Sequence, residues 1–204
     1  MTGRSRVVLA SRNAHKISEM ARILDEAGLH VDVVGIDEFD DVPEVAETEP
    51  TFEGNALLKA RAVCAATGVP AVSDDSGLCV DALNGMPGVL SARWSGGKGD
   101  VANLELVLAQ LGDTPDDRLA AHFTCAVALV LPDDREAVVH GDMHGRLVRN
   151  PRGANGFGYD PIFVPDGEQR TSAELTDVEK DAISHRGNAL RALVPVLRTL
   201  LPEQ

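Results

Sequence analysis

Short apolar runs alternate with stretches of helical spacing over the first part of this chain, and this alternation restricts the fold most. Strands are predicted at Arg6–Ala10, Val31–Val34 and Pro70–Ser73. Apolar residues recur every three or four positions over 17–27 and again over Thr51–Thr67, which predicts two helices. Because strands that alternate with helices usually pair in parallel, the turns after the first and third strands should open on the same edge of one sheet.

The second half of the chain predicts an antiparallel addition to that sheet. Strand-like runs at Ala120–Leu131 and Glu136–Leu147 are joined by a short turn, as in a hairpin. Asp100 is expected to cap the helix before them, and an apolar stripe over 190–201 predicts a last helix. The fold class is therefore α/β, with a mixed central sheet and flanking helices.

Composition limits the class of partner. A length of 204 residues with 44% apolar residues fits one domain over residues 1–204. We expect it to have two lobes without a separable linker. The formal charge of −13 argues against a nucleic-acid polymer as partner, because such binding depends on basic side chains that displace counterions. A small anion stays possible where local cations offset the overall charge.

The cysteines and the apolar runs indicate a compartment. Cys64, Cys79 and Cys125 are odd in number and have no C-x-x-C spacing, which disfavours a disulfide framework and a structural zinc site. No apolar run is long enough to span a bilayer, and the first residues lack the apolar region of a signal peptide. We therefore expect a cytoplasmic protein with no membrane partner.

Adjacent carboxylates follow the third predicted strand, in the sequence Val72-Ser73-Asp74-Asp75-Ser76-Gly77. Side chains at this end of a strand project toward the ligand crevice of an open α/β sheet, and two acids there would attract a divalent metal. If the strand continues, Asp74 and Asp75 face opposite ways, so one could bind metal while the other positions or deprotonates water. An ordinary turn in which Asp, Ser and Gly satisfy the backbone is the alternative.

Two other segments carry donors suited to phosphate. Ser11–Lys16 follows a strand and opens a helix, where free N–H groups, the helix dipole and a lysine could hold phosphate. Ser184–Arg186 begins the last helix, and Lys180 lies shortly before it, so these donors could bind an acceptor oxygen or phosphate. The alternatives are an N-cap with a solvated lysine in the first segment and solvated surface cations in the second.

The segment Gly153–Pro161 is rich in glycine yet contains Phe157 and Tyr159. A ring on such a loop suits a planar ligand, since stacking on a base contributes on the order of 1 to 3 kcal/mol. A bulged strand with its ring in the core is the alternative.

Acidic residues precede the second predicted helix. Glu44, Glu47, Glu49 and Glu53 favour the positive end of that helix, and one or two could complete a magnesium shell with Asp75.

Four motifs in this order together resemble the Ham1/RdgB family of inosine/xanthosine triphosphate pyrophosphatases. They are Ser11–Lys16, Ser73–Leu78 with its sequel Gly85–Arg93, Gly156–Phe163 and Ser184–Gly187. The resemblance implies two lobes around a long active-site cleft and a homodimeric, Mg²⁺-dependent enzyme. It also implies cleavage of non-standard purine nucleoside triphosphates (ITP, dITP, XTP) between the α and β phosphates.

The resemblance also implies roles for individual residues. Asp75 would be the catalytic base and a metal ligand, and Glu44 or Glu47 would complete the metal shell. The implied substrate-binding residues are Ser11, Arg12, Asn13, Ala14, His15, Lys16, Lys59, Ser76, Phe157, Gly158, Tyr159, Asp160, Lys180, His185 and Arg186. Ala46 and Gly54 depart from the family pattern, in which glutamates are common at both positions. Two other functions stay open: a Maf-like pyrophosphatase with a different base preference, and a nucleotide sensor without turnover.

Overall fold

The computed structural model describes residues 5–201, which form two compact units. Residues 5–75, 125–141 and 187–201 make up the first unit, and residues 76–124 and 142–186 make up the second. The chain passes from one unit to the other three times within a strand, first between Asp75 and Ser76, and once within a helix, between Arg186 and Gly187.

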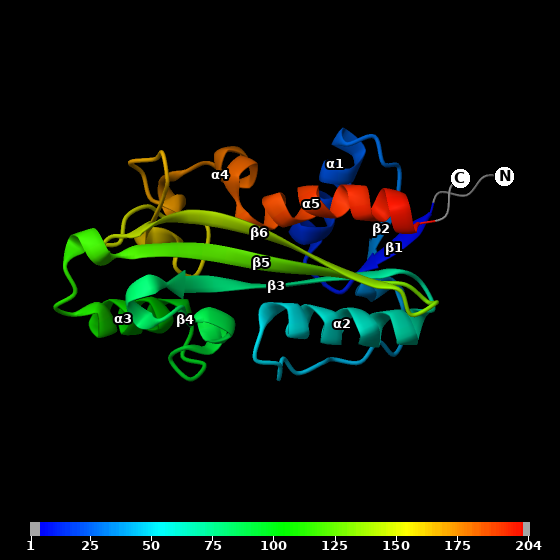
Figure 1. Cartoon of the computed structure of the whole chain (residues 1–204), viewed down its shortest axis with the longest axis horizontal. Helices are drawn as coiled ribbons and strands as arrows, with labels where there is room; N and C mark the ends of the chain where they lie inside the picture. The colour runs from blue at the N-terminus through cyan, green and yellow to red at the C-terminus, as the bar shows by residue number, and fades with distance from the viewer. Residues whose placement is uncertain (1–4, 202–204) are drawn as a thin grey trace. The chain divides into compact units, whose positions relative to one another are not determined.

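The first unit contains the predicted alternation of strands and helices. Its elements are β1 (Arg6–Leu9), α1 (Ala14–Glu26), β2 (Asp32–Gly35), the 3-10 turn η1 (Ile36–Glu38), α2 (Phe52–Thr67), the first half of β3 (Ala71–Val80) and most of α5 (His185–Leu200). β1 pairs in parallel with both β2 and β3, which confirms the predicted parallel sheet. Figure 1 shows α1 and α5 on one side of these strands and α2 on the other.

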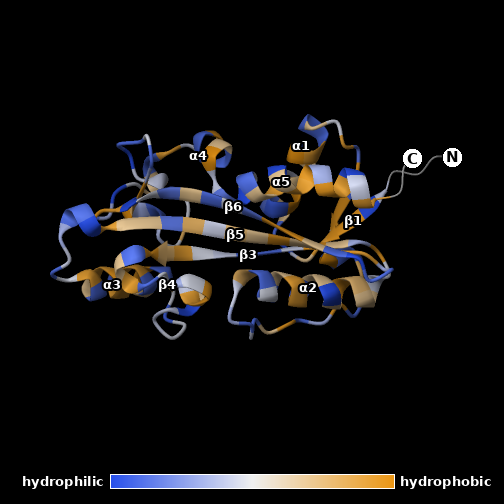
Figure 2. Cartoon of the chain, in the orientation of Figure 1, coloured by the Kyte–Doolittle hydropathy of each residue, from blue (hydrophilic) through white to orange (hydrophobic). Residues whose placement is uncertain are grey.

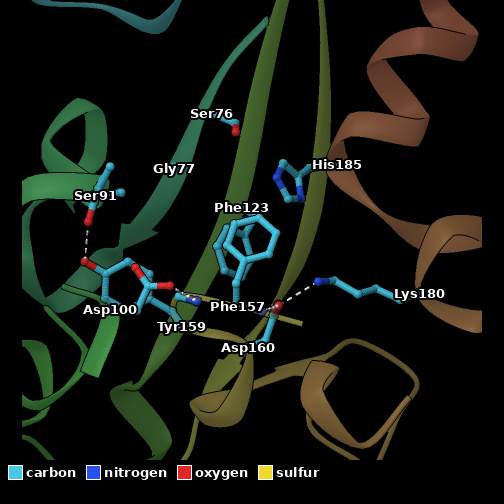
Figure 3. A pocket seen from close by; sticks show the side chains of 12 residues that line it. Ser76, Gly77, Ser91, Asp100, Phe123, Phe157, Tyr159, Asp160, Lys180 and His185 are labelled. Atoms are coloured by element: carbon cyan, nitrogen blue, oxygen red, sulfur yellow. Dashed lines mark hydrogen bonds and ion pairs between the residues drawn. The ribbon is translucent and has the colours of Figure 1, made fainter. Parts of the chain in front are cut away.

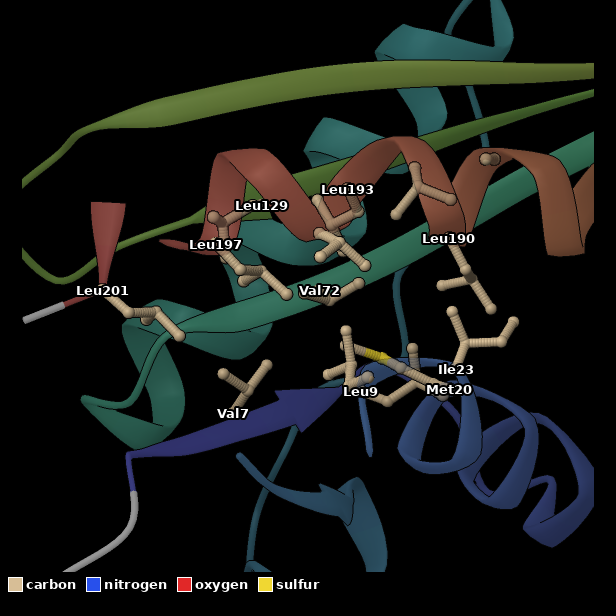
Figure 4. Packing of buried hydrophobic residues seen from close by; sticks show 14 of the residues in the cluster. Val7, Leu9, Met20, Ile23, Val72, Leu129, Leu190, Leu193, Leu197 and Leu201 are labelled. Carbon is tan, nitrogen blue, oxygen red and sulfur yellow. The ribbon is translucent and has the colours of Figure 1, made fainter. Parts of the chain in front are cut away.

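Alternate residues of each strand in the first unit pack against different helices. Val7, Leu9 and Val72 are buried with α1 and α5, as Figure 4 shows. Val8 and Ala71, which occupy the intervening positions, are buried with α2. Because successive side chains of a strand point to opposite faces, Asp74 and Asp75, which follow in β3, are expected to face α1 and α2 respectively.

The second unit is built on the predicted hairpin. β5 (Ala120–Val130) pairs with β6 (Glu136–Leu147), and both strands are shared with the first unit. The second unit adds β4 (Met86–Pro87), α3 (Asp100–Leu111), β7 (Phe163–Pro165) and α4 (Asp177–Ile183). The strand order is β2-β1-β3-β5-β6-β7, with β4 beside β3, so the sheet is mixed as predicted.

The core of the second unit lies between α3 and the strands. Leu104, Val107 and Leu111 of α3 are buried with Leu78 of β3 and Phe163 of β7. Figure 2 shows that α3 and β5 carry mainly hydrophobic residues. No helix within residues 5–201 is both long and apolar enough to cross a membrane.

Two sequence predictions were wrong in their boundaries. The third strand does not end at Ser73 but continues to Val80, so Asp74 and Asp75 lie in the middle of β3 and not in a turn. Asp100 is the first residue of α3, and Gly99 occupies the N-cap position. In both cases the carboxylates have partners far away in the sequence, which a local pattern cannot show.

Candidate active site

Asp74 and Asp75 face different helices of the first unit. Both oxygens of Asp74 accept hydrogen bonds from Lys16 Nζ on α1, at 3.1 and 2.9 Å. Asp75 Oδ2 accepts a hydrogen bond from Asn55 Nδ2 on α2, at 2.9 Å. The two aspartates are only 8% and 9% exposed. The prediction that a continuing strand would send the two carboxylates in opposite directions is therefore confirmed.

Lys59 connects Asp74 to the acidic segment that precedes α2. Its Nζ donates to the backbone carbonyl of Asp74 at 2.7 Å and to Glu47 Oε1 at 2.6 Å. The backbone N–H of Glu49 donates to Asn55 Oδ1 at 2.9 Å. Glu44 is exposed and forms no hydrogen bond or ion pair within residues 5–201. Of the two candidate metal ligands, Glu47 therefore lies in the same cluster of charged groups as Lys59, and Glu44 does not.

The turn between β1 and α1 is organised as a helix N-terminus. Asn13 is the N-cap and accepts a hydrogen bond from the backbone N–H of His15 at 2.9 Å. Ser11 Oγ accepts from the backbone N–H of Asn13 at 3.1 Å. Arg12, Ala14 and His15 are exposed. The N-cap interpretation is thus confirmed for Asn13, and phosphate binding by this turn stays a prediction.

A pocket in the second unit brings together seven of the predicted substrate-binding residues (Figure 3). It is lined by Ser76, Gly77, Ser91, Ala92, Asp100, Phe123, Phe157, Gly158, Tyr159, Asp160, Lys180 and His185. Arg186 is half-buried and is not among these lining residues. Residues from β3, β5, the glycine-rich loop, α4 and α5 therefore meet at one pocket.

Asp160 fixes the glycine-rich loop to Lys180. Its side chain is 5% exposed, and its Oδ2 accepts hydrogen bonds from Lys180 Nζ at 2.6 Å and from the backbone N–H of Phe157 at 2.8 Å. Lys180 Nζ also lies 5.2 Å from the centroid of the Phe157 ring, within cation-π distance. The Phe157 residue is 69% exposed, so its ring is available to a ligand.

The two aromatic residues of this loop differ in environment. Tyr159 is 4% exposed, and its hydroxyl donates to the Ser91 carbonyl at 2.8 Å. Burial raises the pKa of the Tyr159 phenol well above its ordinary value, so the group stays neutral. Phe157 fits the ligand-stacking interpretation, whereas Tyr159 fits the alternative in which the ring belongs to the core.

Five lining residues were not predicted to bind substrate, namely Gly77, Ser91, Ala92, Asp100 and Phe123, and three of them contact predicted residues. Phe123 of β5 stacks on the ring of His185, with centroids 5.0 Å apart and an interplanar angle of 15°. Asp100 Oδ2 accepts a hydrogen bond from the Gly158 N–H at 2.9 Å, and Ser91 binds Tyr159. Phe123 occupies an inward position of its strand and therefore resembles an ordinary core residue in the sequence.

The oxygen donors near Asp75 suit a hard cation. Within the described part of the chain no three His, Cys, Asp or Glu side chains are placed to hold a metal by themselves. Mg²⁺ usually takes only one or two protein carboxylates and fills its shell with water and phosphate oxygens. Asp75 and Glu47 each carry a carboxylate of this kind, and their binding of Mg²⁺ stays a prediction.

Comparisons with known proteins agree with these observations. The model of the Ham1 family matches residues 7–196. The dITP/XTP pyrophosphatase of Streptomyces coelicolor is 60% identical over 198 residues, which cover 97% of this chain and 99% of the relative. That of Nocardia farcinica is 59% identical and covers 96% of both chains.

Solved structures give the same result. A nucleoside-triphosphatase / dITP/XTP pyrophosphatase from Mycobacterium abscessus is 55% identical with a TM-score of 0.79, and the match covers 95% of this chain and 100% of that chain. A HAM1 protein from Coxiella burnetii is 44% identical with a TM-score of 0.88, and the match covers 96% and 99% of the two chains.

Proposed function

This chain belongs to the Ham1 family, and on that premise we propose that it hydrolyses ITP, dITP and XTP to the nucleoside monophosphate and pyrophosphate. One observation of the structure carries the proposal: seven of the predicted substrate-binding residues line a single pocket of the second unit. Relatives that are 55 to 60% identical over nearly the whole chain are dITP/XTP pyrophosphatases.

The first unit supplies the groups that act on the triphosphate. Asp75 is the acceptor for the proton of the attacking water, because it is a buried carboxylate whose orientation is fixed by Asn55. Lys16 and Lys59 neutralise phosphate oxygens with their ammonium groups. Ser11 to His15 add the exposed N-terminal turn of α1, where N–H groups favour an anion.

Asp75 and Glu47 would hold Mg²⁺ in this arrangement, and the cation would supply positive charge to the phosphate oxygens and to water. The proton of the water passes to Asp75, the water oxygen bonds to phosphorus, and the bond between the α and β phosphates breaks. The two lysines stabilise the negative charge that builds up on the departing pyrophosphate.

The second unit selects the base. Phe157 stacks on the purine, and Lys180 and His185 supply donors for a 6-oxo group. Adenine has a 6-amino group in that position, which would place a donor against a donor and leave a buried group unsatisfied. Hypoxanthine and xanthine have the 6-oxo group and are accepted. Guanine has it too, so its rejection depends on another part of the ring, the 2-amino group that hypoxanthine and xanthine lack.

A pyrophosphate-release assay with ITP, XTP, GTP and ATP, with and without Mg²⁺, tests the function. We expect rapid release from ITP and XTP only when Mg²⁺ is present. Equal rates for all four nucleotides would contradict the base preference. A preference for other bases would support the Maf-like alternative, and no release would support a sensor.

We also propose that the protein is a cytoplasmic homodimer. Sedimentation should give twice the 21.6 kDa of one chain. A cytoplasmic location is consistent with the three cysteines, all of which are buried and free.

A further inference from the structure

Asn55 joins Asp75 to the acidic segment through both ends of one side chain. Its Nδ2 donates to Asp75 Oδ2 and its Oδ1 accepts from the backbone N–H of Glu49, each at 2.9 Å. The residue is fully buried. These partners fix the orientation of the amide, because a reversed amide would place a donor against the N–H and an acceptor against the carboxylate.

The start of α2 is shaped to bring the acidic segment close to Asn55. A Cβ atom at Gly54 would lie 2.6 Å from the Cβ of Glu49, so only glycine fits here without displacing the segment. One helical turn after Asn55, Lys59 binds the Glu47 carboxylate at 2.6 Å. Residues 55 and 59 therefore hold the segment at two points, one on its backbone and one on a side chain.

We propose that Asn55 is a positioning residue for the metal-dependent reaction. Its amide orients the Asp75 carboxylate and, through Glu49, holds the segment that carries Glu47, so that both acids are in place before a cation binds. This inference rests on the proposed function, because it assumes that Asp75 and Glu47 are metal ligands. Asn55 itself acts through Asp75 and Glu49, with which its side chain forms hydrogen bonds.

The chain contains a matched control residue. Asn103 is the fourth residue of α3, as Asn55 is the fourth of α2, and it is 1% exposed. Its Oδ1 accepts from the backbone N–H of Ser95 at 2.7 Å, and its Nδ2 donates to a backbone carbonyl at 3.2 Å. It therefore fixes a loop to a helix in the same way, but within residues 5–201 its side chain forms no hydrogen bond with a carboxylate.

The test compares Asn55→Ala with Asn103→Ala in the full chain without nucleotide. Binding of Mn²⁺ is measured by electron paramagnetic resonance, with Mg²⁺ as competitor. We expect both variants to lose thermal stability, and only Asn55→Ala to lose affinity for the cation. The affinity should fall about tenfold, which is the lower end of the usual effect of removing a residue that hydrogen-bonds to a metal ligand. In turnover, Asn55→Ala should lower kcat and leave the KM for ITP within about twofold, since Asp75 and Glu47, which Asn55 positions, bind the metal and not the base.

Wild-type cation affinity in Asn55→Ala would overturn the inference, and so would an equal loss in Asn103→Ala. Should Asn55→Ala fail to fold, Asn55→Ser is measured instead, because a hydroxyl is too short to reach both partners and the same loss is expected. Asp75→Asn provides the reference: unchanged cation affinity in that variant would refute the proposed metal site itself. Loss of affinity in Asp75→Asn without loss in Asn55→Ala would refute only the role of Asn55.

Discussion

Each of the two units holds a lysine on a buried aspartate, and the two pairs differ in what surrounds them. Lys16 and Asp74 lie 2.9 Å apart in the first unit, and Lys180 and Asp160 lie 2.6 Å apart in the second. The aspartate side chains are 8% and 5% exposed. The carbonyl of Asp74 is also bound by a second lysine, Lys59. Asp160 instead accepts a hydrogen bond from the backbone N–H of Phe157, whose ring is exposed.

The same kind of ion pair therefore lies in two different environments, one suited to a charged ligand and one to a planar ligand. In the first unit, two lysines and several carboxylates lie in one cluster, which suits a highly charged triphosphate with its cation. In the second unit, Lys180 is the one Lys or Arg side chain that lines the described pocket, and most other lining groups are rings or small residues. Such a pocket suits a planar, uncharged base with a few polar edges.

The largest effect should come from Asp75→Asn, which removes the proposed general base of the first unit and leaves the second unit unchanged. We expect kcat for ITP to fall about a thousandfold, as is typical when a general base is removed. The amide has nearly the same shape and can still accept a hydrogen bond from Asn55, so the melting temperature should change little. Hydrolysis of ITP at the wild-type rate would refute the assignment of the base.

A second experiment compares Lys16→Met with Lys180→Met. Each change removes a hydrogen bond from a charged donor worth about 2 kcal/mol, so kcat/KM for ITP should fall about thirtyfold in each. The fall should be the same for ITP and ATP in Lys16→Met, because both have the same triphosphate. It should be smaller for ATP than for ITP in Lys180→Met, because adenine lacks the 6-oxo group to which Lys180 donates. An equal loss for ITP and ATP in Lys180→Met would mean that this lysine does not contact the base.

The sequence was sufficient to predict the fold of the first unit, because its strands and helices have clear periodicities and clear ends. Gly68, for example, ends α2 in a left-handed conformation with φ of +66°. The length of β3 was not predictable in the same way. Adjacent carboxylates usually indicate a turn, and the partners that keep them in a strand, Lys16 and Asn55, are 58 and 20 residues away.

The sequence predicted the residues of the base pocket better than their environments. Phe157 and Tyr159 are two positions apart in one loop, and no local pattern distinguishes them. Tyr159 is buried because its hydroxyl reaches the Ser91 carbonyl, 68 residues away, while Phe157 has no such partner within the described residues. Phe123 was missed for the opposite reason, since a ring at an inward strand position usually belongs only to the core.

Two glycines of the loop allow the Lys180–Asp160 pair to be tested without changing either residue. Gly156 and Gly158 have φ of +73° and +62°, so alanine at either position should lower the free energy of unfolding by about 1 kcal/mol. A Cβ at Gly156 would lie 2.1 Å from Asp160 Oδ2 and 3.1 Å from Lys180 Nζ, while nothing lies within 4 Å of one at Gly158. The Cβ at Gly156 should therefore displace the ion pair. Gly156→Ala should raise the KM for ITP by about fivefold, which corresponds to a loss of roughly 1 kcal/mol of binding free energy. Equal KM values for the two variants would show that the ion pair does not shape the pocket.

The smallest expected effect concerns the helix that carries Lys180. The backbone N–H of Thr176 donates to the Glu179 carboxylate at 2.9 Å, and the Thr176 hydroxyl and Arg170 also donate to it. These bonds lower the pKa of Glu179 from 4.5 to about 2. A pKa that is lower in the folded state stabilises α4 above pH 4.5, and this stabilisation is lost as the pH falls from 4.5 toward 2.

Hydrogen exchange of α4 amides over that pH range should therefore show local opening as Glu179 becomes protonated, after correction for the intrinsic effect of pH on exchange. Glu179→Gln keeps a side-chain carbonyl for the cap but cannot titrate, so its α4 should be less protected at neutral pH and change less with acid. The amides of α1, which carries Lys16 and has no acid in its first turn, provide the internal comparison. If α1 and α4 opened together in the wild type, the transition would be global unfolding, and the carboxylate of Glu179 would not control the position of Lys180.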